Sequence, residues 1–367
     1  MDPKRHNIKI QNLRQSVITS ALALFFSLLL GAVLLLLCGY SPVESYAAIF
    51  GYSFKSVKGF ALTLSQATPI LFTGMSFAIA YRVRMINTGA EGQLYAGAMA
   101  AALVGAYVKG LPAPLHVLLC LLAAALVGGL IAAGVAAIKI KFGASEIILT
   151  LLLNDIIKHL TSFLANGPLR PADSGIAQTA RILDTAKLIR LIPQTQLTMA
   201  FPIGIALAVI IQVILNRTKF GFEGQVTGYN LRAARTAGIH VSKIYLSTFA
   251  ISGAVAALGG AAMALGVNYR FLDGFSANYG FGGISVAALA AYSPAGVILS
   301  SFLIGLLKAG AITLNRTTNI PIEFVSVIQV MVIIFVAAPK LIRSIVDKPA
   351  AGLKKLVKKN GKGKEAA

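Results

Sequence analysis

Long apolar runs alternate with short polar segments along almost the whole chain. Most runs approach the twenty residues that an α-helix needs to cross the hydrocarbon core of a bilayer. The pattern predicts an all-α polytopic membrane protein with about ten transmembrane helices, some of them short or broken. The expected spans are residues 17–39, 60–80, 90–109, 115–138, 146–165, 197–215, 244–267, 280–292, 294–314 and 322–339.

The first run, residues 17–39, follows several basic residues and could be mistaken for a signal peptide. It is longer than a signal-peptide core, and no clear small-x-small cleavage site follows it. We therefore expect this run to be retained as a membrane helix.

Composition agrees with a membrane protein, because 57% of the 367 residues are hydrophobic and only 12% are charged. A soluble chain would carry about 25% charged residues. The formal net charge of +21 could suggest binding to nucleic acid. However, the basic residues lie in short clusters between the apolar runs, which is how lysine and arginine orient membrane proteins. We expect no nucleic-acid partner.

The basic residues also predict the orientation. With the N-terminus inside, most of the 33 lysines and arginines fall in the inner segments, so both termini are expected in the cytoplasm. The predicted division is a cytoplasmic segment at 1–16, a transmembrane domain at 17–342 and a basic cytoplasmic tail at 343–367. The lysine-rich tail is expected to rest on anionic membrane lipid.

Two connecting segments are long enough to have a function of their own. Residues 166–196 are predicted to form an outer loop that caps or docks on the external face. Residues 216–243 are predicted to lie in the cytoplasm, where a short helix starts after Asn230 and stops at Gly238. The segment is either a solvated connector or a docking helix for a partner, with Arg232 and Arg235 facing that partner.

A polar turn interrupts the apolar pattern between the second and third spans, in the stretch RVRMINTGAEGQLYAG at 82–97. Thr88 and Glu91 have the spacing of a capping box, which predicts a new helix here. Unpaired backbone groups at bilayer depth are tolerated only against protein or a water-filled cavity. We therefore expect the turn to line a path for solute. Glu91 is a helix cap or a solute contact, whereas Asn87 and Gln93 offer uncharged donors and acceptors.

The same N-x-G-x-x-G pattern returns at Asn278–Gly283, again at the head of an apolar run. Under the predicted topology the two copies run in opposite directions, which is typical of an inverted repeat around a solute path. Tyr279 and Phe281 flank Gly280 in the second copy. Their rings suit either contact with a flat solute ring or a membrane-interface belt.

The fifth span has several polar residues near its middle: Asn154, Asp155, Lys158 and His159. Asn154 is a candidate for the solute path. Helical spacing would let Asp155 neutralise Lys158 and bond His159 on one face. An intramembrane ionisable cluster can serve a coupled ion or proton, and the alternative is a satisfied pair that faces the bundle interior.

Catalysis by this chain is not expected. The sequence contains no G-x-x-x-x-G-K-S/T loop, no H-E-x-x-H and no G-x-S-x-G. The four histidines show no metal-ligand spacing, so no metal site is expected. Any ATP hydrolysis that drives the protein must take place in another polypeptide.

Four stretches resemble the permease subunits of binding-protein-dependent ABC importers of the ribose, branched-chain amino acid and nucleoside kind: Ile86–Gly97, Gly221–Ile239, Ile251–Gly260 and Tyr279–Pro294. The NTGAEGQ form is similar to the nucleoside or simple-sugar branch. Where family members tend to carry an apolar or aromatic residue, this chain has Asp155. The resemblance covers most of the chain, from about Ser41 to Pro339.

The resemblance implies a bacterial cytoplasmic membrane protein with several partners. They are a second identical or homologous permease subunit, cytoplasmic ATPase subunits that bind ATP and Mg²⁺, and an extracytoplasmic solute-binding lipoprotein. It also implies that residues 216–243 form the coupling loop seated in the ATPase. The permease itself would then bind no cofactor. The alternative from another class is an ion-coupled secondary transporter or channel that uses Asp155, Lys158 and His159.

Overall fold

The computed structural model describes residues 25–318, together with 327 and 330. The chain divides into two compact units, one made of residues 1–45 and 320–367 and the other of residues 46–319. In the first unit an apolar helix at Phe25–Leu37 falls inside the first predicted span. The predicted segments at 1–16 and 343–367, and nearly all of the predicted span at 322–339, lie outside the described residues.

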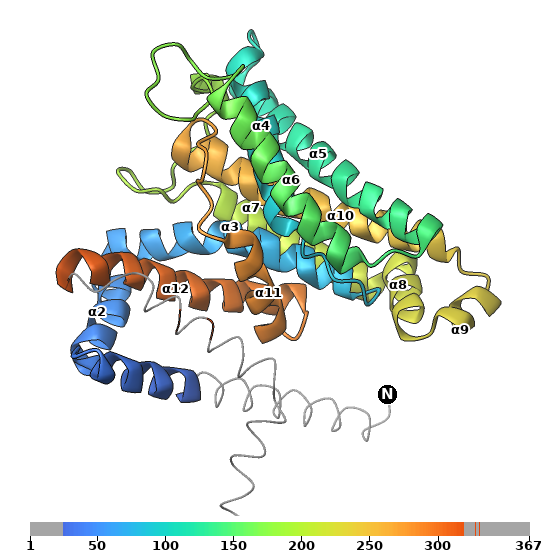
Figure 1. Cartoon of the computed structure of the whole chain (residues 1–367), viewed down its shortest axis with the longest axis horizontal. Helices are drawn as coiled ribbons and strands as arrows, with labels where there is room; N and C mark the ends of the chain where they lie inside the picture. The colour runs from blue at the N-terminus through green and yellow to red at the C-terminus, as the bar shows by residue number, and fades with distance from the viewer. Residues whose placement is uncertain (1–24, 319–326, 328–329, 331–367) are drawn as a thin grey trace, which may run out of the picture. The chain divides into compact units, whose positions relative to one another are not determined.

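The second unit is helical, and its longer helices match the predicted spans (Figure 1). They are α3 (Val57–Tyr81), α4 (Ala90–Tyr107), α5 (Ala113–Phe142), α6 (Glu146–Asn166), α7 (Ala200–Arg217), α10 (Val241–Met263), α11 (Tyr279–Leu289) and α12 (Pro294–Thr318). Across residues 25–318 only isolated β-bridges occur and no strand. Six helices in the described part of the chain are long and apolar enough to span a membrane. The all-α class is confirmed for this part, while the total of ten spans stays a prediction.

The helices α2 (Pro42–Lys55) and α8 (Lys219–Tyr229) are not among the predicted spans, whereas a π-helical turn at Ala264–Asn268 prolongs α10 to the end of the predicted span 244–267. Neither α2 nor α8 has the long apolar run by which the spans were found. Helix α8 begins at an N-cap residue, Thr218, whose hydroxyl accepts a hydrogen bond from the Gly221 amide.

Helix α10 packs closely against α4 and α5 through small residues. A methyl group added at Gly260 would lie 1.8 Å from the carbonyl oxygen of Leu94, and one added at Gly253 would lie 2.3 Å from that of Gly128. Membrane helices associate through such small residues because they let backbones approach and gain van der Waals contact. The three helices therefore touch backbone to backbone.

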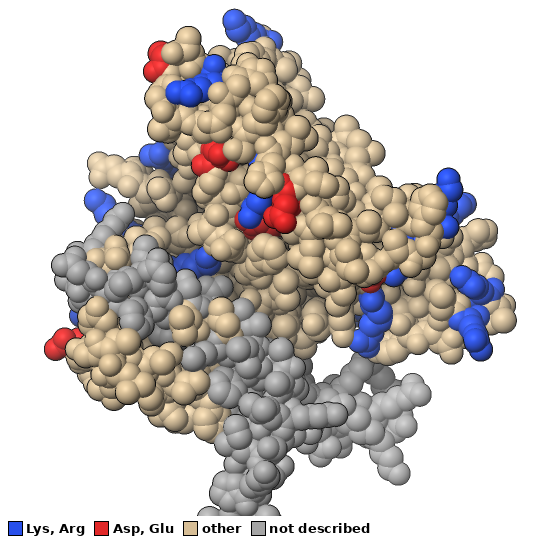
Figure 2. Space-filling model, viewed as in Figure 1, with Lys and Arg blue, Asp and Glu red and all other residues tan. Residues whose placement is uncertain are grey.

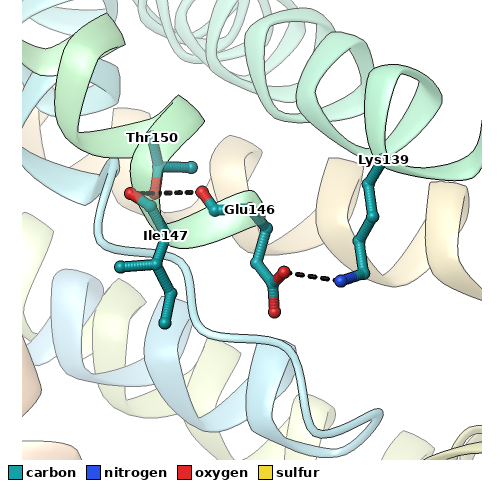
Figure 3. A network of polar contacts seen from close by, with 4 residues as sticks. All are labelled: Lys139, Glu146, Ile147 and Thr150. Carbon is teal, nitrogen blue, oxygen red and sulfur yellow. Dashed lines mark hydrogen bonds and ion pairs between the residues drawn. The ribbon is translucent and has the colours of Figure 1, made fainter. Parts of the chain in front are cut away.

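The predicted inner segments gather at one end of these helices. Val83 after α3, Val135 near the end of α5 and Ile244 at the start of α10 belong to one buried cluster, against which Phe220 of α8 packs. At the same end Lys139 of α5 forms an ion pair with Glu146 of α6, beside the hydrogen bonds of Thr150 (Figure 3).

The predicted outer loop, residues 166–196, packs on the other ends of α4 and α10. The Leu183 amide donates to the carbonyl of Gly105, and the Leu188 amide donates to that of Leu265. His116 of α5 contacts the Thr185 hydroxyl at 2.8 Å. The segments thus separate into the two groups that the charge pattern predicted, and their assignment to cytoplasm and exterior stays a prediction.

Candidate functional site

The turn between α3 and α4 is buried and its polar side chains bond to one another. The Asn87 amide nitrogen lies 2.8 Å from Gln93 Oε1 and 2.9 Å from the hydroxyl of Ser252 on α10. Gln93 Nε2 donates back to Asn87 Oδ1 at 3.1 Å. Asn87 and Gln93 are 0% and 1% exposed. Their contact with a solute stays a prediction, since in this chain their hydrogen bonds hold the turn against α3 and α10.

The predicted capping box is wrong. Helix α4 has Gly89 as its N-cap and makes no side-chain capping bond there. The Thr88 hydroxyl bonds the Thr150 hydroxyl of α6 instead. Glu91 is directed toward α11. The side chains of Thr88 and Glu91 therefore bond partners on other helices and do not cap α4.

The two N-x-G-x-x-G turns are in contact. Glu91 Oε2 accepts a hydrogen bond from the Gly280 amide at the start of α11. A methyl group added to Gly280 would lie 2.4 Å from the Cα of Glu91. A carboxylate is stabilised by the positive end of a helix dipole. The Thr73 hydroxyl of α3 also donates to the Tyr279 carbonyl at 2.9 Å. Both turns therefore meet inside the bundle, although the inverted repeat itself stays a prediction.

Glu91→Ala is expected to lower the free energy of unfolding by about 1.5–3 kcal/mol, because it leaves the buried Gly280 amide without its acceptor. Glu91→Gln keeps an acceptor oxygen and is expected to retain most of the stability. Thermal unfolding of both variants in detergent tests this role. A larger loss for Glu91→Gln than for Glu91→Ala would contradict it.

Asn154 joins α6 to the first turn with both ends of its amide. Its Oδ1 accepts from the Gly92 amide at 2.7 Å, and its Nδ2 donates to the Thr88 carbonyl at 2.8 Å. The side chain is 2% exposed. Asn154 therefore lies at the predicted site and fixes the place of α6 beside the turn.

One interpretation expected the charged residues that follow Asn154 to pair with each other inside the bundle. The structure does not show this pair. Asp155 and His159 are exposed, and among the described residues Asp155 and Lys158 form no ion pair. Lys158 lies 5.7 Å from the centre of the Tyr95 ring. Figure 2 shows acidic and basic side chains next to each other on the face that α6 occupies in Figure 1.

These residues continue along α6 as one polar strip, which we define as Asp155, Lys158, His159 and Ser162; Asp155 and His159 are exposed, and Lys158 and Ser162 are half-buried. The Ser162 hydroxyl donates to Asp273 Oδ2 at 2.7 Å. Each charge at the centre of a membrane helix costs about 2.5–3.5 kcal/mol when it faces hydrocarbon. The strip therefore requires a polar environment, either water or another polypeptide.

The aromatic residues of the second turn differ in burial. Tyr279 is 5% exposed and its hydroxyl donates to Gln66 Oε1 at 2.8 Å, whereas Phe281 is 36% exposed. Tyr95 and Phe275, which sequence reasoning did not single out, form an aromatic cluster with Phe271, in which the rings of Tyr95 and Phe275 lie 4.8 Å apart.

The predicted short helix after Asn230 is confirmed as α9, Leu231–Thr236, and its location in the cytoplasm stays a prediction. Asn230 Oδ1 accepts from the amides of Arg232 and Ala233, and Gly238 follows the helix with φ of +76°. Arg232 and Arg235 are exposed and form no ion pair with any described residue. Figure 2 shows basic side chains gathered where Figure 1 places α9.

Arg82, which sequence reasoning did not single out, connects this region to the helices. Its Nε donates to the Gly221 carbonyl of α8 at 3.1 Å, and its Nη2 donates to the Leu215 carbonyl of α7. Arg82 directly follows α3. The end of α3 is therefore bonded to the junction that leads to α9.

Apolar helices of membrane-spanning length around buried polar turns define a multi-pass membrane protein of the transport class. The chain belongs to the family described as branched-chain amino acid transport system / permease component, whose model matches residues 59–337. This assignment places it in the cytoplasmic membrane.

Individual relatives extend over nearly the whole chain. It is 33% identical to the guanosine ABC transporter permease protein NupP of Bacillus subtilis, over 89% of this chain and 94% of that protein. It is 32% identical to the glucose ABC transporter permease protein TsgB13 of Haloferax volcanii, over 86% of each. It is 28% identical to the nucleoside ABC transporter permease protein NupB of Lactococcus lactis, over 93% of this chain and 96% of that protein.

Proposed function

We propose that this chain is the permease subunit of an ABC importer for a nucleoside or a related sugar-containing solute. The observation that carries the proposal is the polar strip of α6, with Asp155 and His159 exposed, which Asn154 fixes beside the buried turn. A nucleoside is polar and uncharged, with many hydroxyl and ring donors and acceptors. The strip carries hydrogen-bond donors and acceptors, and these side chains can bond such a solute as it crosses the membrane.

ATP and Mg²⁺ would be bound by separate cytoplasmic ATPase subunits, with α9 seated in them. Movement of α9 would reach α3 through Arg82, because that side chain bonds α7 and α8 to the end of α3. Helix α3 in turn bonds the second turn through Thr73 and the first turn through Ser76. This continuous set of contacts supports alternation between outward-open and inward-open states.

The other proposed partners are a second permease subunit and an extracytoplasmic solute-binding lipoprotein. A second subunit facing α6 would place the polar strip at a shared, solvated path and remove it from lipid. The ion-coupled alternative is less well supported, because Asp155 and Lys158 form no ion pair in the described residues and the relatives are named as ABC transporter permeases.

Reconstitution tests the function directly. The chain and its genomically adjacent subunits in proteoliposomes should import a labelled nucleoside only when ATP is enclosed with the ATPases. Collapse of the proton gradient should leave uptake unchanged. Uptake that persists without ATP and stops with the gradient would refute the proposal.

Labelling of α6 tests the path itself. In a background without Cys38, Asp155→Cys should react with a water-soluble thiol reagent, and solute with its binding protein should slow the reaction. Ile156→Cys is the matched control, because Ile156 is the next residue, is 59% exposed and lies toward the apolar side of α6. Equal labelling at both positions would show that the strip has no special access to water.

A further inference from the structure

A polar cavity of about 310 Å³ lies away from α6, at the end of the second unit that holds α8. Its wall is formed by the end of α3, by α7 and α8, and by the turn between α11 and α12. This volume falls in the usual range for pockets that bind small molecules. The positive-inside rule predicts that this end of the molecule faces the cytoplasm.

The wall of this cavity is basic. Arg82 and Arg84 both line it, and no acidic residue is among the described residues that do. Arg82 uses two of its five N–H donors on the carbonyls of Gly221 and Leu215, so its positive charge is held in place at the wall. Arg84 is exposed, and its guanidinium contacts the Tyr81 hydroxyl. The cavity therefore favours an anion.

The wall is also aromatic. The rings of Tyr81 and Tyr292 stack with centroids 3.6 Å apart and planes 14° apart, and Tyr229 lies beside them. The Arg84 guanidinium lies 4.8 Å from the Tyr81 ring centre and 5.4 Å from that of Tyr229. Such rings provide a surface on which a flat ring can stack.

Two amide side chains complete the wall with unused hydrogen-bonding groups. Asn216 and Gln225 line the cavity, and neither side chain forms a hydrogen bond with the described part of the chain. The backbone here is strained, because Arg84 and Tyr292 have φ of +57° and +59°. Strain of this kind costs about 1–3 kcal/mol per residue and concentrates at ligand-binding sites.

We propose that this cavity is a binding site for a cytoplasmic anion that carries a flat ring, of the nucleoside monophosphate class. The guanidinium of Arg84 would bind the phosphate, the tyrosines would stack on the base, and the free amides would contact its edge. Inorganic phosphate and lipid headgroups satisfy only the first of these contacts. The proposal is independent of the transported solute, because none of the residues that line the cavity lies on the strip of α6.

Equilibrium dialysis with radiolabelled uridine monophosphate tests the site. The full-length chain in detergent is used without ATPase subunits, which bind nucleotides themselves. We expect saturable binding, at least tenfold weaker competition by uridine, and no displacement by an equal concentration of inorganic phosphate or of anionic phosphatidylglycerol. Absence of saturable binding would overturn the proposal, and so would displacement by phosphate or by the lipid.

Arg84→Gln is expected to weaken binding about tenfold or more, because it removes a charge-assisted contact. Arg190→Gln is the matched control, since Arg190 also bonds a tyrosine hydroxyl and lies over the Tyr269 ring, in the outer loop. Equal losses in both variants would overturn the proposal. If Arg84→Gln does not elute as a folded monodisperse protein, Tyr229→Leu replaces it, because Tyr229 is 70% exposed. Unchanged binding in that variant would overturn the aromatic contact.

Discussion

Replacing Gly280 with alanine is expected to abolish transport and to destabilise the protein by about 3 kcal/mol or more. The added methyl group would lie 2.4 Å from both the backbone nitrogen and the Cα of Glu91. Backbone atoms cannot move aside as the end of a flexible side chain does. The two turns would have to separate, and the hydrogen bond from the Gly280 amide to Glu91 would be lost.

Gly134→Ala is the matched control for this prediction. Gly134 lies within α5, and a methyl group added there meets nothing within 4 Å. Alanine is favoured over glycine inside a helix by about 1 kcal/mol. Reconstituted uptake and the thermal midpoint in detergent are measured for both variants. If Gly280→Ala transports as fast as Gly134→Ala, the contact between the turns is not required for transport.

Charge reversal at Arg232 and Arg235 together is expected to abolish association with the ATPase subunits while insertion into the membrane persists. Both side chains are exposed on α9 and have no ion-pair partner in the described part of the chain. The change replaces two positive charges by two negative ones on a short helix whose own fold depends on Asn230 and Gly238. Copurification of tagged permease with the ATPases measures the effect.

A double reversal at Arg181 and Arg190 provides the control, since both are exposed in the outer loop, at the other end of the second unit. It changes the net charge by the same amount and should leave copurification at the normal yield. Normal copurification of the Arg232 and Arg235 variant would refute the docking role of α9. A loss in both variants would point to a general effect of charge.

Features that depend on neighbouring residues were predicted well from the sequence. The apolar runs identified the long helices, because twenty apolar residues in succession have one stable arrangement in a membrane. The α9 helix was also predicted, since Asn230 caps it and Gly238 ends it within the same few residues. Short helices such as α2 lack an apolar run of that length, and they were missed.

Features that depend on distant partners were predicted poorly. Glu91 fits a capping box by spacing, yet its carboxylate bonds an amide 189 residues further along the chain. Asp155 and Lys158 have the spacing of an ion pair, yet α6 is rotated so that Asp155 faces outward. Spacing alone fixes which residues share a face of a helix, whereas packing against other helices decides where that face points.

The backbone contacts of α10 with α4 and α5 bear on how such proteins diversify. Gly260 and Gly253 leave no room for a larger residue, so this interior admits almost no variation in size. Asp155 and His159 on α6 are under no such constraint, because both are exposed and neither bonds a neighbouring helix among the described residues. If α6 lines the proposed solute path, a few substitutions on this one helix can change the solute preference, while the architecture that carries them is inherited intact.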